Sequence, residues 1–319
     1  MDNQSSPFVL RDVAPIDRSK FVDPTRTANG EARARVALEG LETLWFNTGT
    51  LCNLACKSCY IESSPKNDAL VYITLGEVRA YLDEIARDQL PTREIAFTGG
   101  EPFMNPDMIA ILTLCLERGF DVLVLTNAMR PMRRFEDALL ALPHRERLTL
   151  RVSLDHYTRS VHEAERGLSW DKAIDGLRWL AQNGFRIAVA GRHLQTETDT
   201  DARVGFGALF EDLGLAIDPD DPAQMVLFPE MDESADIPEI TTACWDILSV
   251  DPRSMMCASS RMVVKRKGEA TPRVAACTLL PYQDGFDLGE TLAEASGEVA
   301  LNHPHCARFC VLGGASCTA

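Results

Sequence analysis

Three cysteines lie close together in the stretch LCNLACKSCY, which covers residues 51–60. Cys52, Cys56 and Cys59 follow the spacing C-x3-C-x2-C. Soft sulfur ligands in proteins select zinc, copper(I) or iron–sulfur clusters. A structural zinc site is normally closed by four ligands, and this loop offers three without an adjacent histidine. A cubane cluster held by three cysteines keeps one iron open, so the triplet predicts a position where a further ligand binds.

A second motif, TGGEP, covers residues 98–102 at the end of the next predicted strand. Together the cysteine triplet and GGEP resemble the radical S-adenosylmethionine (SAM) enzymes. The resemblance implies a [4Fe–4S] cluster on Cys52, Cys56 and Cys59, whose open iron binds the methionine part of SAM. It also implies an activity, in which an electron from the cluster breaks a C–S bond of SAM. The resulting 5′-deoxyadenosyl radical then takes a hydrogen atom from a substrate.

The resemblance also implies a set of residues that bind SAM. Gly99, Gly100 and Glu101 would hold the amino group of its methionine part, and the two glycines would let the backbone approach the ligand closely. One position departs from the family pattern, because the residue before the third cysteine is Ser58 rather than an aromatic residue. The full set of expected cofactor-binding residues is Tyr60, Gly99, Gly100, Glu101, Pro102, Ser153, Asp155 and Arg192.

Strands that alternate with helices must position these residues. Helix signals include a capping box of Thr74 with Glu77, a start at Asn105-Pro106, and Ser169 as the cap of a later helix. Six alternations predict a parallel sheet with right-handed crossovers, in agreement with the α/β partial (β/α)6 TIM-like barrel that the resemblance implies. The predicted strands are Thr43–Phe46, Glu94–Thr98, Asp121–Thr126, Leu148–Leu154, Phe185–Ala190 and Met225–Phe228.

The motifs fall at the carboxyl ends of these strands, where parallel α/β sheets bind ligands. The cysteine triplet follows the first strand and GGEP follows the second. Ser153 and Asp155 close the fourth strand, and Arg192 closes the fifth. By resemblance, Ser153 or Asp155 would reach the ribose of SAM, and Arg192 its carboxylate.

Six further cysteines occur after residue 240, and five of them group around a predicted β-hairpin. Arg261–Arg266 and Arg273–Leu279 are the strand-like runs, with Cys257 before the hairpin and Cys277 on its second strand. This arrangement resembles the twitch and SPASM extensions that carry an auxiliary cluster in many radical SAM enzymes. The resemblance implies a second [4Fe–4S] cluster, held by Cys257, Cys277 and two of Cys306, Cys310 and Cys317.

A structural zinc ion on the same thiolates is the alternative. His303 or His305 could join a zinc site, although histidines beside prolines are more often surface residues. Cys115 and Cys244 are assigned to the core, because buried cysteine behaves as a small hydrophobic residue.

Length and composition favour an N-terminal arm (residues 1–40), a barrel (41–235) and a small C-terminal cysteine-rich β-hairpin extension (236–319). The net charge of −15 disfavours a nucleic-acid partner. No apolar run is long enough to span a membrane. Ten cysteines without a secretion signal predict a reducing, cytoplasmic location.

The predicted function is that of a radical SAM enzyme acting on a small molecule or a short peptide. A reductase, a flavodoxin or a ferredoxin would donate the electron. The alternative is a peptide-modifying enzyme of the RiPP or protein-maturating type, but the arm is too short to form a peptide-binding domain. A non-catalytic iron–sulfur electron carrier or sensor would need clusters but has no use for GGEP. A zinc-organised interaction protein would explain the last third of the chain but not the open triplet.

Overall fold

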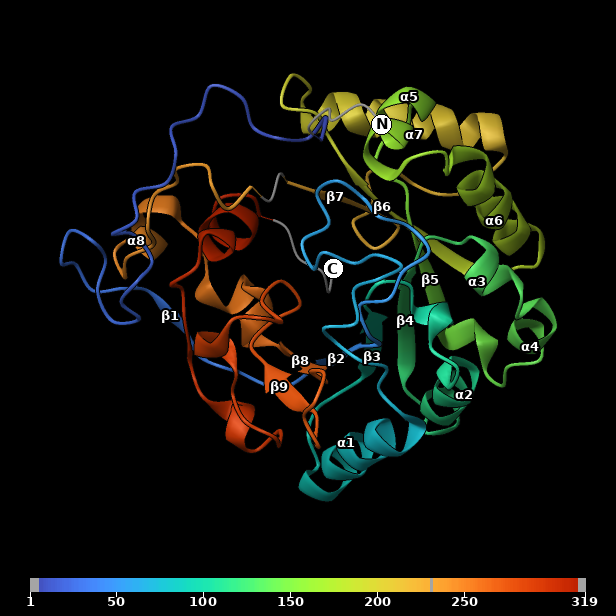
Figure 1. The fold of residues 1–319 in the computed structure, drawn as a ribbon, viewed down its shortest axis with the longest axis horizontal. Coiled ribbons are helices and arrows are strands. Elements are labelled where there is room, and N and C mark those ends of the chain that lie inside the picture. Colours follow the sequence, from blue (N-terminus) through green and yellow to red (C-terminus); the bar gives the residue numbers. More distant parts are fainter. Residues whose placement is uncertain (1–5, 230–231, 315–319) are drawn as a thin grey trace.

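Six parallel strands form an open barrel in the computed structural model, which describes residues 6–229 and 232–314 (Figure 1). Each strand pairs with its neighbour in the sequence, in the order β7-β6-β5-β4-β3-β2. All six begin and end within two residues of the predicted bounds. Their bounds are β2 (Thr43–Asn47), β3 (Glu94–Thr98), β4 (Asp121–Thr126), β5 (Leu148–Ser153), β6 (Arg186–Arg192) and β7 (Met225–Phe228).

The helices of the barrel lie outside the strands, as the alternating pattern predicts (Figure 1). The predicted capping box is present, since Thr74 and Glu77 satisfy each other's backbone N–H groups at the start of α1. The helices are α1 (Leu75–Asp88), α2 (Met108–Glu117), α3 (Arg130–Arg133), α4 (Glu136–Leu140), α5 (Arg159–Arg166), α6 (Trp170–Gln182) and α7 (Asp199–Leu213), with α8 (Cys244–Leu248) beyond the barrel.

One of the predicted helix starts was wrong, and another is confirmed in position but lacks the expected capping hydrogen bond. Helix α2 begins at Met108, because Asn105 precedes a proline and takes an extended conformation, and its amide instead accepts the N–H of Asp107. Ser169 does occupy the N-cap position of α6, but its side chain makes no capping hydrogen bond. Its hydroxyl pairs with the buried ring of His162 at 2.9 Å.

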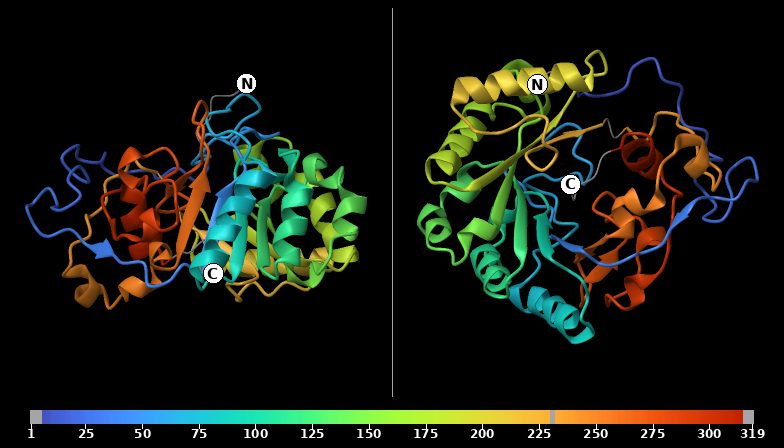
Figure 2. Two further views of the ribbon diagram at one scale, coloured as in Figure 1. Left: turned by 90° about the horizontal axis from the view of Figure 1, so that it is seen from below. Right: turned by 180° about the vertical axis from the view of Figure 1, so that it is seen from behind.

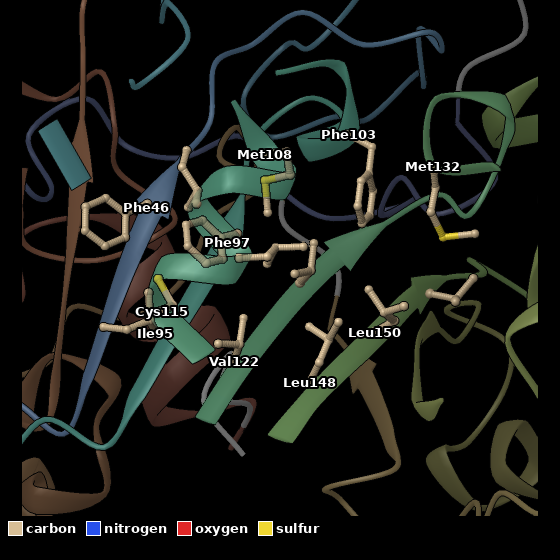
Figure 3. Packing of buried hydrophobic residues seen from close by; sticks show 14 of the residues in the cluster. Phe46, Ile95, Phe97, Phe103, Met108, Cys115, Val122, Met132, Leu148 and Leu150 are labelled. Carbon is tan, nitrogen blue, oxygen red and sulfur yellow. The ribbon is translucent and has the colours of Figure 1, made fainter. Parts of the chain in front are cut away.

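Side chains of alternate strand residues point into two different hydrophobic cores. Phe46 and Phe97 face the helices and stack on each other at 5.7 Å, beside Met108 and Cys115 of α2 (Figure 3). Trp45, one residue along in β2, points to the other face. There it packs into the core of the C-terminal part, which is the described portion of residues 236–319. This two-residue alternation gives the sheet a buried surface on both sides. Cys115 is fully buried, which confirms its assignment to the core.

The C-terminal hairpin is part of the barrel sheet. Its first strand, β8 (Ser260–Val264), pairs with β2 in parallel, and β9 (Arg273–Ala275) pairs with β8 in the opposite direction. The sheet therefore has eight strands where the sequence predicted six plus a separate hairpin. Because β9 ends at Ala275, Cys277 lies after the second strand of the hairpin and not on it. Figure 2 shows the C-terminal segments on the side of the strands opposite to the barrel helices.

The N-terminal arm connects these two parts of the molecule. It runs from the barrel, where Phe8 is buried, across to the C-terminal part (Figure 1). There the N–H of Ile16 donates to the carbonyl of Ser234 at 2.8 Å. Further along, β1 (Arg35–Val36) pairs with β10 (Val299–Ala300). The arm thus contacts both the barrel and the C-terminal part.

Candidate functional site

The three cysteines of the triplet line one cavity at the carboxyl ends of the barrel strands. The loop that carries them is closed by backbone hydrogen bonds, including Cys52 N–H to the carbonyl of Ser64 at 3.1 Å. Backbone N–H groups also face the sulfur atoms, from Leu54 to Cys52 Sγ and from Ser63 to Cys59 Sγ. Other expected residues on the cavity wall are Tyr60, Gly99, Gly100, Ser153, Asp155 and Arg192.

The three thiols, one buried and two half-buried, are a donor set that fits a metal centre. Burial raises the pKa of Cys52 to about 12, so the uncoordinated group keeps its proton at neutral pH. Coordination to a metal deprotonates such a thiol and provides the positive charge that its thiolate lacks. Cys52, Cys56 and Cys59 on one cavity wall are a donor set that would hold a [4Fe–4S] cluster and leave one iron for a further ligand.

At both glycines of GGEP the neighbouring backbone leaves no space for a side chain. A side chain on Gly99, where φ is +146°, would begin 2.7 Å from the carbonyl oxygen of Gly49. One on Gly100 would begin 2.2 Å from the carbonyl oxygen of Leu51. The N–H of Gly100 donates to the carbonyl of Gly49 at 2.7 Å. The end of β3 therefore packs directly against the backbone that leads into the cysteine loop.

Glu101 connects the ends of β3 and β4. Its carboxylate accepts hydrogen bonds from the hydroxyl of Thr126 and the N–H of Asn127, both at 2.8 Å, and it does not line the cavity. Burial raises the pKa of Glu101 to about 7, although these hydrogen bonds favour the charged form. Pro102 starts a buried 3₁₀ turn and is likewise off the cavity wall. Glu101 and Pro102 therefore support the residues that line the cavity without lining it themselves.

We expect the Glu101→Gln variant to show a weaker pH dependence of stability than the wild type. The pKa of Glu101 is higher in the folded protein than its ordinary value of 4.5, so its proton favours folding at low pH. That contribution is lost as the pH rises through about 7. Calorimetry between about pH 5 and pH 8 should therefore show a smaller fall in Tm for the variant. Parallel curves for wild type and variant would contradict this assignment; exposed Glu62→Gln is the control.

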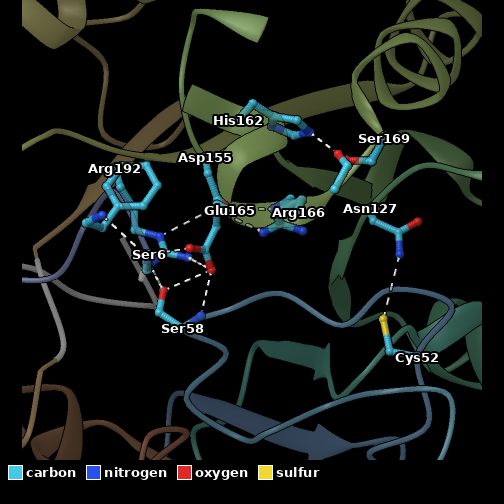
Figure 4. A network of polar contacts seen from close by, with 12 residues as sticks. Ser6, Cys52, Ser58, Asn127, Asp155, His162, Glu165, Arg166, Ser169 and Arg192 are labelled. Atoms are coloured by element: carbon cyan, nitrogen blue, oxygen red, sulfur yellow. Dashed lines mark hydrogen bonds and ion pairs between the residues drawn. The ribbon is translucent and has the colours of Figure 1, made fainter. Parts of the chain in front are cut away.

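Asp155 lies between two arginines at the cavity wall (Figure 4). Its carboxylate accepts from Arg166 of α5 at 2.6 and 3.1 Å, and from Arg192 at the end of β6 at 3.4 Å. Burial by itself would raise the pKa of Asp155, but the two guanidinium groups hold it well below its usual range. Asp155 is therefore a fixed negative charge that orients both arginines.

Glu165 fastens the cysteine loop to helix α5. Its buried carboxylate accepts from the N–H and the hydroxyl of Ser58 at 2.8 and 2.9 Å, and its carbonyl accepts the N–H of Lys57 at 3.1 Å. Ser6 of the N-terminal arm donates to the same carboxylate at 2.5 Å (Figure 4). Arg192 completes the group by donating to the hydroxyl of Ser58 at 2.7 Å. The residue that replaces the family's usual aromatic is thus held by hydrogen bonds.

We expect Glu165→Ala to destabilise the protein by about 3 kcal/mol, because it leaves the donors of Ser58 and Ser6 without their buried acceptor. The loop between Cys56 and Cys59 should loosen, and the iron retained after anaerobic reconstitution should fall about 10-fold or more. Glu165→Gln keeps an acceptor for Ser58 and should lose less. Thermal unfolding and iron content after anaerobic reconstitution measure the effects. Glu163→Ala on the same helix is the matched control, and equal losses in both alanine variants would contradict this role.

Several residues of the site were not found from the sequence. Arg166 and Glu165 are adjacent on a short helix, where two charged residues usually indicate a solvated face. The sequence places Asn127 at the end of the third predicted strand, but only the structure shows its contacts. It donates to Asn53 at 2.9 Å and points toward Cys52 Sγ, 4.0 Å away. Figure 4 shows the pair of Asn127 and Cys52.

A second cavity brings together the cysteines of the C-terminal part. Cys257, Cys277, Cys306 and Cys310 all line it, among apolar side chains such as Met255 and Leu280. Burial raises the pKa of Cys257 to about 11, and burial also raises the pKa of Cys306 well above its ordinary value. Four thiols on one wall are a donor set that fits a [4Fe–4S] cluster or zinc. Cys317 lies outside the described residues. Cys244 is not on this wall and packs at the edge of the core.

The expectation that His303 and His305 are surface residues was wrong. Both are buried, at 8% and 2% exposure, and their rings lie 4.8 Å apart. His305 also lines the four-cysteine cavity, and its Nε2 lies 2.9 Å from the carboxylate of Glu233. His303 Nδ1 accepts the N–H of His305 at 3.1 Å, so in the neutral ring the proton is on Nε2. The sequence prediction underestimated how tightly the chain packs after β10.

Comparisons with known proteins agree on one family. The sequence model of the Radical SAM superfamily matches residues 46–204, about half of the chain. Over 141 residues the chain is 31% identical to the antilisterial bacteriocin subtilosin biosynthesis protein AlbA of Bacillus subtilis (strain 168), covering 44% of the chain and 30% of AlbA. It is 28% identical over 220 residues to GTP 3′,8-cyclase 1 of Mycobacterium tuberculosis (strain CDC 1551 / Oshkosh), covering 66% of the chain and 53% of the cyclase. The chain thus spans only part of each relative.

Two solved structures share the fold. Streptococcus suis SuiB bound to S-adenosylmethionine has a TM-score of 0.57 at 11% identity, over 79% of this chain and 63% of SuiB. Native anSMEcpe with bound AdoMet has a TM-score of 0.56 at 14% identity, over 79% of this chain and 80% of that protein. Within residues 6–229 and 232–314, every helix is too short or too polar to span a lipid bilayer.

Proposed function

The chain belongs to the radical SAM superfamily, and on this basis we propose that it cleaves SAM reductively and uses the radical to modify a peptide. Enzymes of this family use a [4Fe–4S] cluster and SAM. The observation that carries the proposal is the convergence of Cys52, Cys56 and Cys59 with strand-end polar residues on one cavity. An electron carrier or sensor would need the cysteines but not the polar wall opposite them.

A [4Fe–4S] cluster held by Cys52, Cys56 and Cys59 would supply the one electron needed to cleave SAM into methionine and a 5′-deoxyadenosyl radical, which would take a hydrogen atom from the substrate. The residues of this chain hold and orient the reactants. In the proposal, the backbone at Gly99 and Gly100 holds the amino group of SAM, and Ser153 faces the ribose. Arg192, oriented by Asp155, faces the carboxylate. Tyr60 closes the side of the cavity next to the cysteine loop.

In the proposal, residues 236–319 hold an auxiliary [4Fe–4S] cluster on Cys257, Cys277, Cys306 and Cys310. Leu279 lines both this cavity and the barrel cavity, which supports electron transfer between the two centres. Four protein ligands leave no open iron, so the role that we assign to the auxiliary cluster is to accept or pass on an electron. A flavodoxin or ferredoxin would donate the electron for SAM cleavage.

A surface groove favours a peptide as the substrate. Tyr60 and Leu279 line both the barrel cavity and an open groove, whose other walls include Lys66, Glu233 and Tyr282. An extended peptide could lie in this groove and insert one side chain toward the radical. The name of AlbA places that relative in bacteriocin biosynthesis, which supports the same substrate class. The match to GTP 3′,8-cyclase covers more of the chain and keeps a small molecule as the second candidate.

Anaerobic reconstitution with iron and sulfide, followed by reduction and addition of SAM, tests the first part of the proposal. The expected product is 5′-deoxyadenosine, formed slowly even without substrate. Clusters without SAM cleavage would indicate an electron carrier or sensor. A colourless protein that contains zinc and no acid-labile sulfide would indicate a zinc-organised protein.

The substrate class is tested with extract from cells of the source organism. Extract that contains the substrate should accelerate 5′-deoxyadenosine formation by the reconstituted enzyme. If the substrate is a peptide, treating the extract with a protease that is then inactivated should remove the acceleration. Acceleration that survives the protease and passes through a small-pore filter would favour the small molecule instead.

A further inference from the structure

Arg261 is a fully buried cation on β8. Only 1% of the residue is exposed, and it is among the largest side chains that are fully buried. In the register of the sheet it lies opposite Leu44 of β2. A guanidinium group stays charged in proteins, and a charge without a counter-charge in the interior is costly. Its position inside the protein therefore requires a physical explanation.

The hydrogen-bond donors of Arg261 are directed at backbone carbonyl groups. Nη1 donates to the carbonyls of Cys257 at 2.6 Å and Ser260 at 2.8 Å. Nε donates to the carbonyl of Ala295 at 2.8 Å, and Nη2 to that of Gly297 at 2.9 Å. These bonds satisfy the donors but supply no negative charge. Among residues 6–229 and 232–314, no carboxylate forms an ion pair with Arg261.

Two thiols of the four-cysteine cavity interact electrostatically with Arg261. Cys257 and Cys277 are the groups whose negative charge would stabilise the guanidinium, and Arg261 in turn favours the thiolate of Cys257. Four thiolates carry more negative charge than a [4Fe–4S] core or a zinc ion neutralises, so either centre keeps a net negative charge. That charge would be the counter-ion that no carboxylate among residues 6–229 and 232–314 provides.

We infer that Arg261 is the counter-charge of the centre on Cys257, Cys277, Cys306 and Cys310, and that it raises the reduction potential of that centre. This inference rests on the proposed auxiliary cluster. Net charge and hydrogen bonding around an iron–sulfur cluster set its potential, and a buried cation stabilises the reduced, more negative state. A higher potential makes the cluster a better acceptor for an electron from the substrate.

The test measures the midpoint potential of the auxiliary cluster by redox titration followed by electron spin resonance. All variants are made in a background protein in which Cys52, Cys56 and Cys59 are replaced by alanine. This protein cannot hold the barrel cluster, so only the auxiliary cluster contributes to the electron-spin signal. Arg261→Gln removes the charge, whereas Arg261→Lys keeps it with fewer hydrogen bonds. Arg273→Gln is the matched control, because Arg273 lies on the neighbouring strand β9, is largely outside the core and pairs with Asp287 at 2.8 Å.

The expected result is a more negative midpoint potential for Arg261→Gln, with Arg261→Lys and Arg273→Gln close to the parent protein. Equal potentials in the parent and in Arg261→Gln would overturn the inference while leaving the cluster in place. If Arg261→Gln does not fold, the second neutral variant Arg261→Met decides: a more negative potential supports the inference, and an unchanged one overturns it. Failure of both variants to fold would assign Arg261 to folding alone and also overturn it.

The failure of the proposed function is a separate outcome. In that case the wild-type protein would bind only the iron and acid-labile sulfide of the barrel cluster. Iron and sulfide analysis of the triple-alanine background, before any substitution at Arg261, distinguishes the two. If the triple-alanine protein holds an iron–sulfur cluster, the potentials of the Arg261 variants can be compared. If it holds zinc alone, both the auxiliary cluster and the inference are overturned.

Discussion

Replacing Cys52, Cys56 or Cys59 by alanine is expected to lower reductive cleavage of SAM by more than about 100-fold. Each thiolate is a proposed ligand of one cluster, and two remaining ligands cannot hold a cubane with an open iron toward the cavity. The measurement is 5′-deoxyadenosine formed by the anaerobically reconstituted and reduced protein. The electron-spin spectrum of the barrel cluster, which should respond to SAM in the wild type, should be lost in the same variants.

Cys115→Ala is the matched control for this experiment. Cys115 is buried in the core on α2 and lies on neither cavity wall. Its replacement should cost about 1 kcal/mol of stability and leave SAM cleavage near the wild-type rate. Undiminished turnover in any of the three triplet variants would reject the assignment of the barrel cluster.

Replacing Cys277 by alanine is expected to separate the two halves of the reaction. The barrel cluster and its ligands are untouched, so SAM cleavage should stay measurable. Product formation should fail, because the auxiliary cluster that we propose on Cys257, Cys277, Cys306 and Cys310 would be lost. The measurement compares 5′-deoxyadenosine with the mass of the modified substrate in the same reaction.

Cys244→Ala is the control for the C-terminal part. Cys244 lies at the start of α8 at the edge of the same core, where its sulfur accepts the N–H of Thr241 at 3.3 Å. This variant should retain full product yield. Full yield from Cys277→Ala as well would show that the second centre is dispensable for the reaction.

The barrel and its motifs could be predicted from the sequence because their signals are local. Apolar runs and helix-terminal residues mark each strand and helix within a few positions. Strand order then follows from the rule that sequential parallel strands are neighbours with right-handed crossovers. The cysteine triplet and GGEP each lie within ten residues, so no long-range folding was needed to recognise them.

The parallel pairing of β8 with β2 could not be predicted in the same way. It joins residues such as Thr43 and Ser260 that are far apart in the sequence. The hairpin pattern of β8 and β9 is complete by itself, so the sequence contains no local indication of a third partner. The pairing follows from the open edge of β2, whose backbone groups need partners once the barrel forms.

The sequence by itself determined which chemistry is present: the cysteine triplet, the glycine motif, the alternating strands and the late cysteine group. Only the tertiary structure decided which charged side chains are buried together. Ser6 and Glu165 meet at Ser58, and Arg261 is buried beside Cys257, across gaps that no periodicity describes. The physical reason is that the energy of a buried charge depends on its neighbours in space. Those neighbours are set by the packing of the whole chain and not by the residues next to it in the sequence.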